Sequence, residues 1–197
     1  MKNLLIAIAF LPVLPLSGQS QENVLFDRVV VHGGFGAPIA ELSSIDRQAG
    51  FFAGGGGGII LNDFFIGGFG EEGDFAEHII DSREYPIRFG YGGLWLGFVK
   101  PTTRVVHFFG SLKIAGGTVR ITERNSEEAL YKEEVFVVKP ELGAEVNLFK
   151  WFRLALTADY RVVGGIRSQS LAGMNNSDFN AAGMALTLRF GKFYKNR

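Results

Sequence analysis

Strict alternation of apolar and polar side chains over residues 152–162 is the feature that most limits how this chain can fold. The even positions hold Phe, Leu, Leu, Ala, Tyr and Val, and the odd positions hold Arg, Ala, Thr, Asp and Arg. A helix would mix the two sets on each face, whereas a β-strand separates them completely. The segment is therefore predicted to be a strand with one apolar face, and the same period appears in residues 136–148, 181–190 and 105–117.

The lengths of these segments favour a membrane. They run for 10 to 13 residues, whereas strands of soluble proteins are usually ~5–6 residues long and a strand tilted across a bilayer needs ~9–11. The glycine-rich first half is expected to add four strands, near residues 28–35, 48–61, 64–70 and 86–98. The sequence therefore predicts eight strands. Pro140 lies within one of them, where we expect a bulge or an end of regular pairing.

The segments between the expected strands alternate in length. The long, mostly polar ones are residues 36–47, 71–85, 123–132 and 164–178. The short ones are residues 62–63, 100–103 and 149–151. We expect the long loops at one end and both chain termini at the other, in an up-and-down order whose closure leaves no exposed strand edge.

The composition of the polar face indicates which side points outward. That face is mostly Gly, Ala, Thr and Ser, which suits a narrow interior better than a surface in water. Its charges are of both signs, and we expect them to pair inside the barrel as a lumen polar network of Lys113, Lys139, Glu141, Glu145, Arg153, Asp159, Arg161 and Arg189. Aromatic residues at strand ends indicate interfacial girdles: Phe64, Phe65, Phe98, Phe149, Trp151, Phe152, Phe179, Phe190, Phe193 and Tyr194. The predicted fold is an all-β, eight-stranded antiparallel up-and-down transmembrane β-barrel.

The first twenty residues carry the features of a cleaved export signal. Lys2 precedes an uncharged apolar run over residues 4–16, and Gly18 and Ser20 place small side chains before a cut at Gln21. We therefore expect a signal peptide at 1–20, a short periplasmic segment at 21–27, the barrel at 28–190 and a periplasmic tail at 191–197. No later segment reaches 18 uncharged apolar residues in a row, so no transmembrane helix is predicted there.

These features together resemble the small OmpA/OmpX-type outer-membrane barrels of Gram-negative bacteria. The final strand, Gly183-Met184-Ala185-Leu186-Thr187-Leu188-Arg189-Phe190, is similar to the signal that barrel-assembly machinery reads in such families. The family typically ends at the aromatic residue, whereas this chain continues to Arg197. The resemblance implies a location in the cell outer membrane with both termini periplasmic. It also implies contact with outer-membrane lipid, and with the assembly machinery during biogenesis.

Few residues point to enzymatic or cofactor chemistry. Balanced charge, with 20 basic and 20 acidic residues, leaves no footprint for nucleic acid, and the absence of Cys excludes disulfides and thiolate zinc sites. Three scattered His residues do not predict a metal site, and no Lys-Ser/Thr follows the Gly54–Gly58 run as a phosphate loop requires. His107 and Ser111 share a strand face but lie roughly 13 Å apart by strand rise, too far for a nucleophile and its base. Four carboxylates in residues 71–77 are interpreted as part of a solvated loop.

The expected function is therefore that of a non-enzymatic membrane barrel with a side-chain-filled lumen. Its role is expected to be structural, or to be binding of a protein partner through external loops or the barrel wall, including as an accessory subunit. No cofactor is expected. Two alternatives remain: an outer-membrane lipid-modifying hydrolase or acyltransferase, and a soluble periplasmic barrel that carries an apolar ligand.

Overall fold

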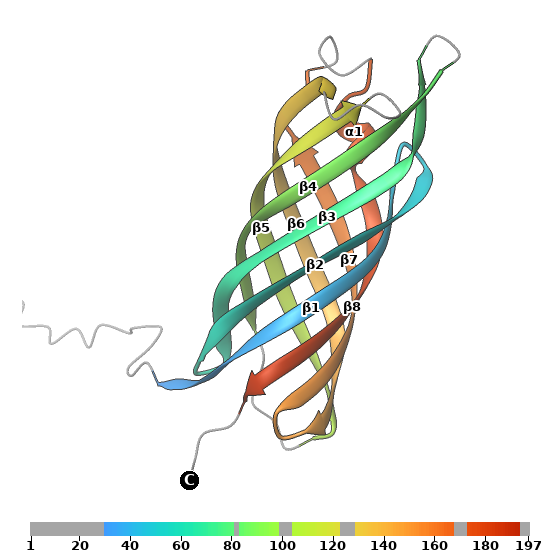
Figure 1. Cartoon of the computed structure of the whole chain (residues 1–197). Coiled ribbons are helices and arrows are strands. Elements are labelled where there is room, and N and C mark those ends of the chain that lie inside the picture. Colours follow the sequence, from blue (N-terminus) through green and yellow to red (C-terminus); the bar gives the residue numbers. More distant parts are fainter. Residues whose placement is uncertain (1–29, 81–82, 99–103, 123–128, 168–172, 194–197) are drawn as a thin grey trace, which may run out of the picture.

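A computed structural model describes residues 30–80, 83–98, 104–122, 129–167 and 173–193. Eight strands and one short helix account for most of them (Figure 1): β1 Val31–Ile45, β2 Gln48–Leu61, β3 Phe64–Ile80, β4 Arg83–Phe98, β5 Val106–Thr122, β6 Ala129–Phe149, β7 Phe152–Gly164, α1 Asn176–Phe179 and β8 Ala181–Lys192. Each strand pairs antiparallel with the next, and β8 pairs with β1. The barrel is therefore closed, and the predicted fold is confirmed.

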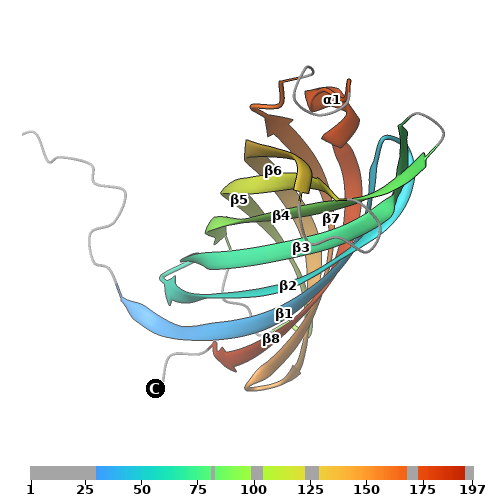
Figure 2. The same ribbon diagram turned by 45° about the horizontal axis from the view of Figure 1, so that its top comes forward.

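The strands form the barrel wall, are markedly tilted relative to the barrel axis and curl around it (Figure 2). The end that carries α1 is called the upper end here. The lower end carries the start of β1, the end of β8, and the β2–β3 and β6–β7 turns (Figure 1). Among the described residues, no helix is long and apolar enough to cross a membrane. The expected signal peptide lies outside the described residues.

Two of the four long loops predicted from the sequence, at residues 36–47 and 71–85, are mostly strand in the structure, so these two predictions are wrong. β1 runs on to Ile45 and meets β2 through a two-residue turn in which Asp46 and Arg47 have positive φ angles of 46° and 63°, as in the type I′ turn of tight hairpins. β3 likewise continues to Ile80, and β4 begins at Arg83. These segments looked like loops because they are polar, but polar side chains are accommodated both inside a barrel and above the membrane surface.

The connection between β7 and β8 is long, running from Gly165 to Asn180 and including α1. Of the expected loop at 123–132, residues 129–132 belong to β6, so that part of the prediction is wrong, and residues 123–128 lie outside the described part of the chain. At the lower end, the barrel continues slightly past its expected limit of residue 190, because β8 ends at Lys192. Residues 194–197 of the expected tail are outside the described part of the chain.

Pro140 interrupts pairing without shifting the register. On one side it is paired with Leu112 of β5. On the other, the pairs step from Val138–Val162 to Glu141–Asp159, so the same register holds before and after the proline. The expected end of regular pairing is therefore present locally on the β7 side, and the alternative of a bulge is wrong.

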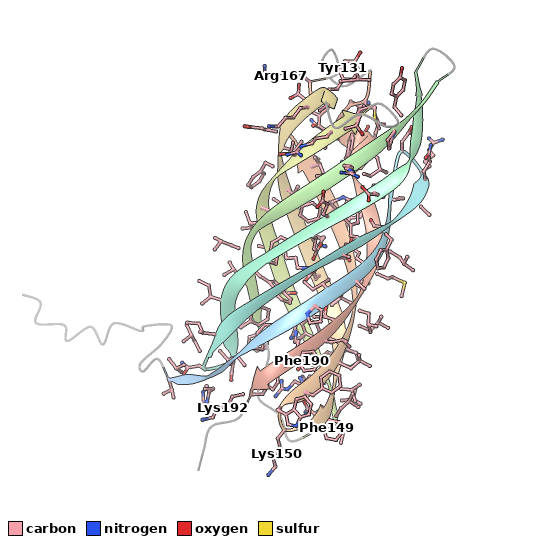
Figure 3. The ribbon with its side chains drawn as sticks, viewed as in Figure 1. Tyr131, Phe149, Lys150, Arg167, Phe190 and Lys192 are labelled. Atoms are coloured by element: carbon pink, nitrogen blue, oxygen red, sulfur yellow. The ribbon has the colours of Figure 1, made fainter. Side chains whose placement is uncertain are left out.

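The apolar face of the strands points away from the barrel axis. Leu142 is 74% exposed and Leu156 52%, whereas Thr157 and Arg161, which alternate with them, are 4% and 0% exposed. Figure 3 shows the side chains that project from the wall, with Phe149 and Phe190 at the lower end and Tyr131 and Arg167 at the upper end. The interior contains charged residues, which must pair with one another there because an unpaired buried charge is costly. The exterior consists of Leu, Ile, Val and Phe. A polar interior with an apolar exterior suits a barrel surrounded by lipid.

Aromatic residues form one outer cluster at the lower end, and others fill the interior. Phe149, Trp151, Phe152 and Phe190 stack at the end of the β6–β7 hairpin, with ring centroids 4.8 to 6.4 Å apart. Phe64 and Phe98 pack together on the neighbouring wall at 5.2 Å. Phe65, Phe179 and Phe193 are instead buried inside the barrel, so their assignment to a girdle is wrong. Tyr194 lies outside the described residues.

Candidate functional site

The middle of the barrel holds a cluster of ion pairs centred on Glu71 of β3. Its carboxylate pairs with the ammonium groups of Lys113 and Lys139, the second at 2.6 Å, and accepts a hydrogen bond from the Tyr91 hydroxyl at 2.9 Å. Lys139 also pairs with Glu41 of β1. Glu41 and Lys139 are completely buried. Residues from five strands thus meet at one level, and the cluster ties opposite sides of the wall together.

Further contacts extend this central cluster toward both ends. Lys113 reaches Glu141 at 2.9 Å, and Glu141 accepts a hydrogen bond from the Ser111 hydroxyl at 2.6 Å. On the upper side, Arg161 donates to the backbone carbonyls of Phe179 at 3.0 Å and Ser44 at 2.6 Å. Because Arg161 donates through two of its nitrogens to backbone oxygens, it joins the charged layer to the segment that closes the upper end.

A second, lower cluster surrounds Glu145 of β6. One carboxylate oxygen accepts from Arg153 at 2.7 Å and lies 3.0 Å from His107 Nε2, and the other accepts from Arg189 at 2.7 Å. Trp95 separates the two clusters. Its ring lies 5.0 Å from the Lys113 ammonium and 5.2 Å from the Arg189 guanidinium, distances at which cation–π attraction stabilises buried cations.

Side chains close the interior above and below the charged layers. At the upper end, Phe52, Phe75, Phe89 and Phe179 make edge contacts with one another at centroid distances of 4.9 to 5.9 Å. At the lower end, the Phe193 ring packs 3.9 Å from the Arg153 guanidinium. Glycine backbones make room for such rings: a Cβ at Gly97 would lie 2.1 Å from Phe65.

The β7–β8 connection holds α1 over the upper end through backbone capping. Asn175 caps the helix, accepting from the Ser177 amide at 2.9 Å while its own amide donates to the Asp178 carboxylate at 2.7 Å, the reciprocal arrangement of a capping box. The Asp46 amide of the β1–β2 turn donates to the Asp178 carbonyl at 2.6 Å. The connection is therefore fastened to the β1–β2 hairpin, whose strand β1 pairs with β8, and Phe179 lies buried in the barrel.

All eight residues expected in the lumen polar network lie inside the barrel. Each is at most 8% exposed: Lys113, Lys139, Glu141, Glu145, Arg153, Asp159, Arg161 and Arg189. Seven of them form ion pairs, among them Arg161 with Glu41 at 3.9 Å. Asp159 lies beside Gly183 of the adjacent strand β8, and its carboxylate oxygens have no hydrogen-bond partner among the described residues. The structure thus brings together residues from four strands.

Sequence reasoning missed the two carboxylates that complete the central cluster. Glu41 and Glu71 fall in segments 36–47 and 71–85, so Glu71 was interpreted as a solvated loop residue, whereas it is 4% exposed in β3. That interpretation is wrong because β3 continues through it. A signal was available: the eight expected residues contain five basic and three acidic side chains. A buried excess of positive charge is unfavourable, so two more carboxylates were required.

The interior offers little for acid–base or metal chemistry. His107 and Ser111 each bind a different carboxylate of β6, Glu145 and Glu141 respectively, and no contact joins the two residues in the described structure. Among the described residues, no group of three or more His, Asp or Glu side chains is arranged to hold a metal ion. The arrangement acts chemically as a set of mutually neutralising charges that locks neighbouring and opposite strands together.

Comparisons with known proteins return matches of fold only. No family model matches the sequence, and no curated protein sequence matches it. Among solved structures, the chain is similar to Neisserial surface protein A, with a TM-score of 0.53 and 10% identity, over 82% of this chain and 96% of that one. It is also similar to Ail, the attachment invasion locus protein of Yersinia pestis, in complex with sucrose octasulfate, with a TM-score of 0.46 and 13% identity, over 82% and 97% of the two chains. The chain has the fold of the small OmpA/OmpX-type eight-stranded barrels.

Proposed function

We propose that this protein is an integral barrel of the outer membrane that acts as a structural or binding protein and not as a pore. The observation that carries the proposal is the inversion of the usual soluble pattern. Large apolar side chains such as Phe108, 83% exposed, and Leu142 cover the outside, and the ion pairs of Glu71 and Glu145 fill the inside. A soluble lipid carrier requires the opposite arrangement, with an apolar interior and a charged surface.

The filled interior supports the absence of conduction. Eight strands leave an interior just wide enough for side chains. Here Glu41 and Lys139 fill the central level, Arg161 and Phe52 lie above them, and none of the four is exposed at all. A permeating solute would have to break these buried ion pairs, which is costly in a low-dielectric interior.

The upper end is the part available for a partner. Strand pairing at that end extends beyond the apolar wall, as in β3 and β4, which pair out to Ile80 and Arg83. In bacterial barrels the end opposite the termini is external. The proposed role is therefore binding at the external loops or support of a larger outer-membrane complex, with both termini in the periplasm.

Fractionation tests the location. Washed outer membranes should contain the protein, and it should migrate differently on a gel with and without boiling, because a closed barrel resists detergent until it is heated. Recovery in the soluble periplasmic fraction would overturn the proposal. In planar bilayers, the refolded chain should give no steady conductance, and porin-like steps would contradict the closed interior.

A further inference from the structure

A row of basic side chains crosses three adjacent strands on the outer wall near the upper end. Arg88 of β4 pairs in register with Arg120 of β5, and Arg120 pairs with Lys132 of β6. All three side chains are exposed and point away from the barrel axis, because the alternate positions Phe89 and Val119 are buried and Tyr131, next to Lys132, packs against the buried core. We call Arg88, Arg120 and Lys132 the basic row.

Such an arrangement is unfavourable for the isolated chain. Side chains directly opposite each other on neighbouring strands have Cβ atoms ~4.5–5.5 Å apart, and like charges at such positions destabilise a sheet. Arg88 is relieved by Asp74, the next residue along the same row, whose carboxylate lies 3.3 Å from Arg88 Nε. In the described part of the chain, neither Arg120 nor Lys132 forms an ion pair.

The nearby carboxylates do not compensate these two cations. Glu134 lies on the same face of β6, one row closer to the middle of the barrel, where it is paired with Thr118. Glu72 lies in that same lower row on β3, two strands away from Arg120. The described structure contains no ion pair between either carboxylate and the basic row.

The height of the row on the wall coincides with the edge of the apolar band. The outward positions of β5 from Val106 to Gly116 hold Val, Phe, Gly, Leu, Ile and Gly. Ten residue steps of ~3.4 Å at a tilt of ~45° rise roughly 24 Å, which matches the ~25 Å apolar band of membrane barrels. Thr118 and then Arg120 follow directly, so Arg120 lies at the level of the lipid headgroups, with Arg88 and Lys132 one strand spacing to either side.

We propose that the basic row binds the phosphate of an anionic lipid headgroup in the external leaflet. Guanidinium and ammonium groups are the usual phosphate ligands, and two of the three here form no ion pair within the described residues, at the depth where headgroup phosphates lie. The inference rests on the proposed placement of the barrel in the outer membrane, since the same row on a soluble protein would face only water.

The test uses native mass spectrometry of the mature chain, refolded in an uncharged, phosphate-free detergent and titrated with diphosphoryl lipid A. Each Lys or Arg near a membrane surface contributes ~1 kcal/mol, so R120Q/K132Q should bind roughly 30-fold more weakly. The control R47Q/K150Q removes the same charge at the β1–β2 and β6–β7 turns and should retain wild-type affinity. D74N, which frees Arg88, should bind more tightly.

Several outcomes would overturn the inference. Equal affinity of wild type and R120Q/K132Q would remove the site, and an equal loss in R47Q/K150Q would show only general charge attraction. Equally tight binding of inositol hexakisphosphate at the same residues would assign the row to a soluble polyanion instead of a lipid. The shift in gel mobility on boiling is measured for every variant. If the wild type lacks the shift, the proposed barrel function fails. If only R120Q/K132Q lacks it, that variant has not folded, and the affinity of D74N for lipid A tests the inference instead, with unchanged affinity of D74N counting against it.

Discussion

The Glu71→Gln substitution provides the sharpest test of the buried central cluster. Glu71 is 4% exposed, pairs with Lys113 and Lys139, and accepts a hydrogen bond from Tyr91. Glutamine keeps the shape of the side chain but removes its charge, which leaves two buried ammonium groups with less compensation. Breaking a buried ion pair costs ~3–5 kcal/mol. Because Lys113 retains Glu141 and Lys139 retains Glu41, we expect a loss near the lower limit, about 3 kcal/mol.

The neighbouring residue is a matched control. Glu72 lies on the same strand, carries the same charge and is exposed on the outer face. Glu72→Gln should change the free energy of unfolding by less than ~0.5 kcal/mol, as is usual for surface substitutions. If residues 71–77 formed a solvated loop, both variants would behave alike.

Urea unfolding in lipid vesicles, followed by tryptophan fluorescence, measures the difference. With a urea dependence of about 2 kcal/mol/M, a loss of ~3 kcal/mol lowers the unfolding midpoint by ~1.5 M. Glu71→Gln should show that shift with an unchanged slope, and the double variant with Lys139→Met should lose less than the sum of the single losses. Indistinguishable midpoints for the Glu71 and Glu72 variants would refute the buried cluster.

Two further predictions test the wall and the packing of the interior. Leu156→Arg, in the middle of the apolar wall, should lower the stability of the folded barrel in vesicles by ~2–4 kcal/mol, and Leu130→Arg, above the basic row, by no more than ~1 kcal/mol; equal losses would contradict the assigned membrane level. Gly183→Ala would place a Cβ 2.8 Å from an Asp159 carboxylate oxygen, and should cost ~1–3 kcal/mol by overpacking. At Gly116 an added Cβ meets nothing within 4 Å, so Gly116→Ala should be neutral or slightly stabilising, and thermal unfolding of both variants distinguishes the two sites.

The strand period determined which side of the wall each residue of β7 occupies. Because side chains alternate between faces with a period of two, the apolar and polar sets of residues 152–162 could be separated without any tertiary information. The same reasoning selected the charged residues of β5 to β8 that lie inside the barrel. It failed for Glu41 and Glu71, because weakly alternating, polar and glycine-rich strands are indistinguishable from loops when only local polarity is considered.

Only the tertiary structure decided how far the strands extend and which charges meet. The partners of Lys139 are 68 and 98 residues away in the chain, and no local pattern can pair them. Their contact depends on the register of all eight strands around the closed barrel, since a shift of one residue would turn each side chain to the opposite face. Local alternation therefore determined that this chain forms an apolar-walled barrel. Closure of that barrel decided which carboxylates and cations neutralise each other inside it, because only closure brings distant strands to the same level.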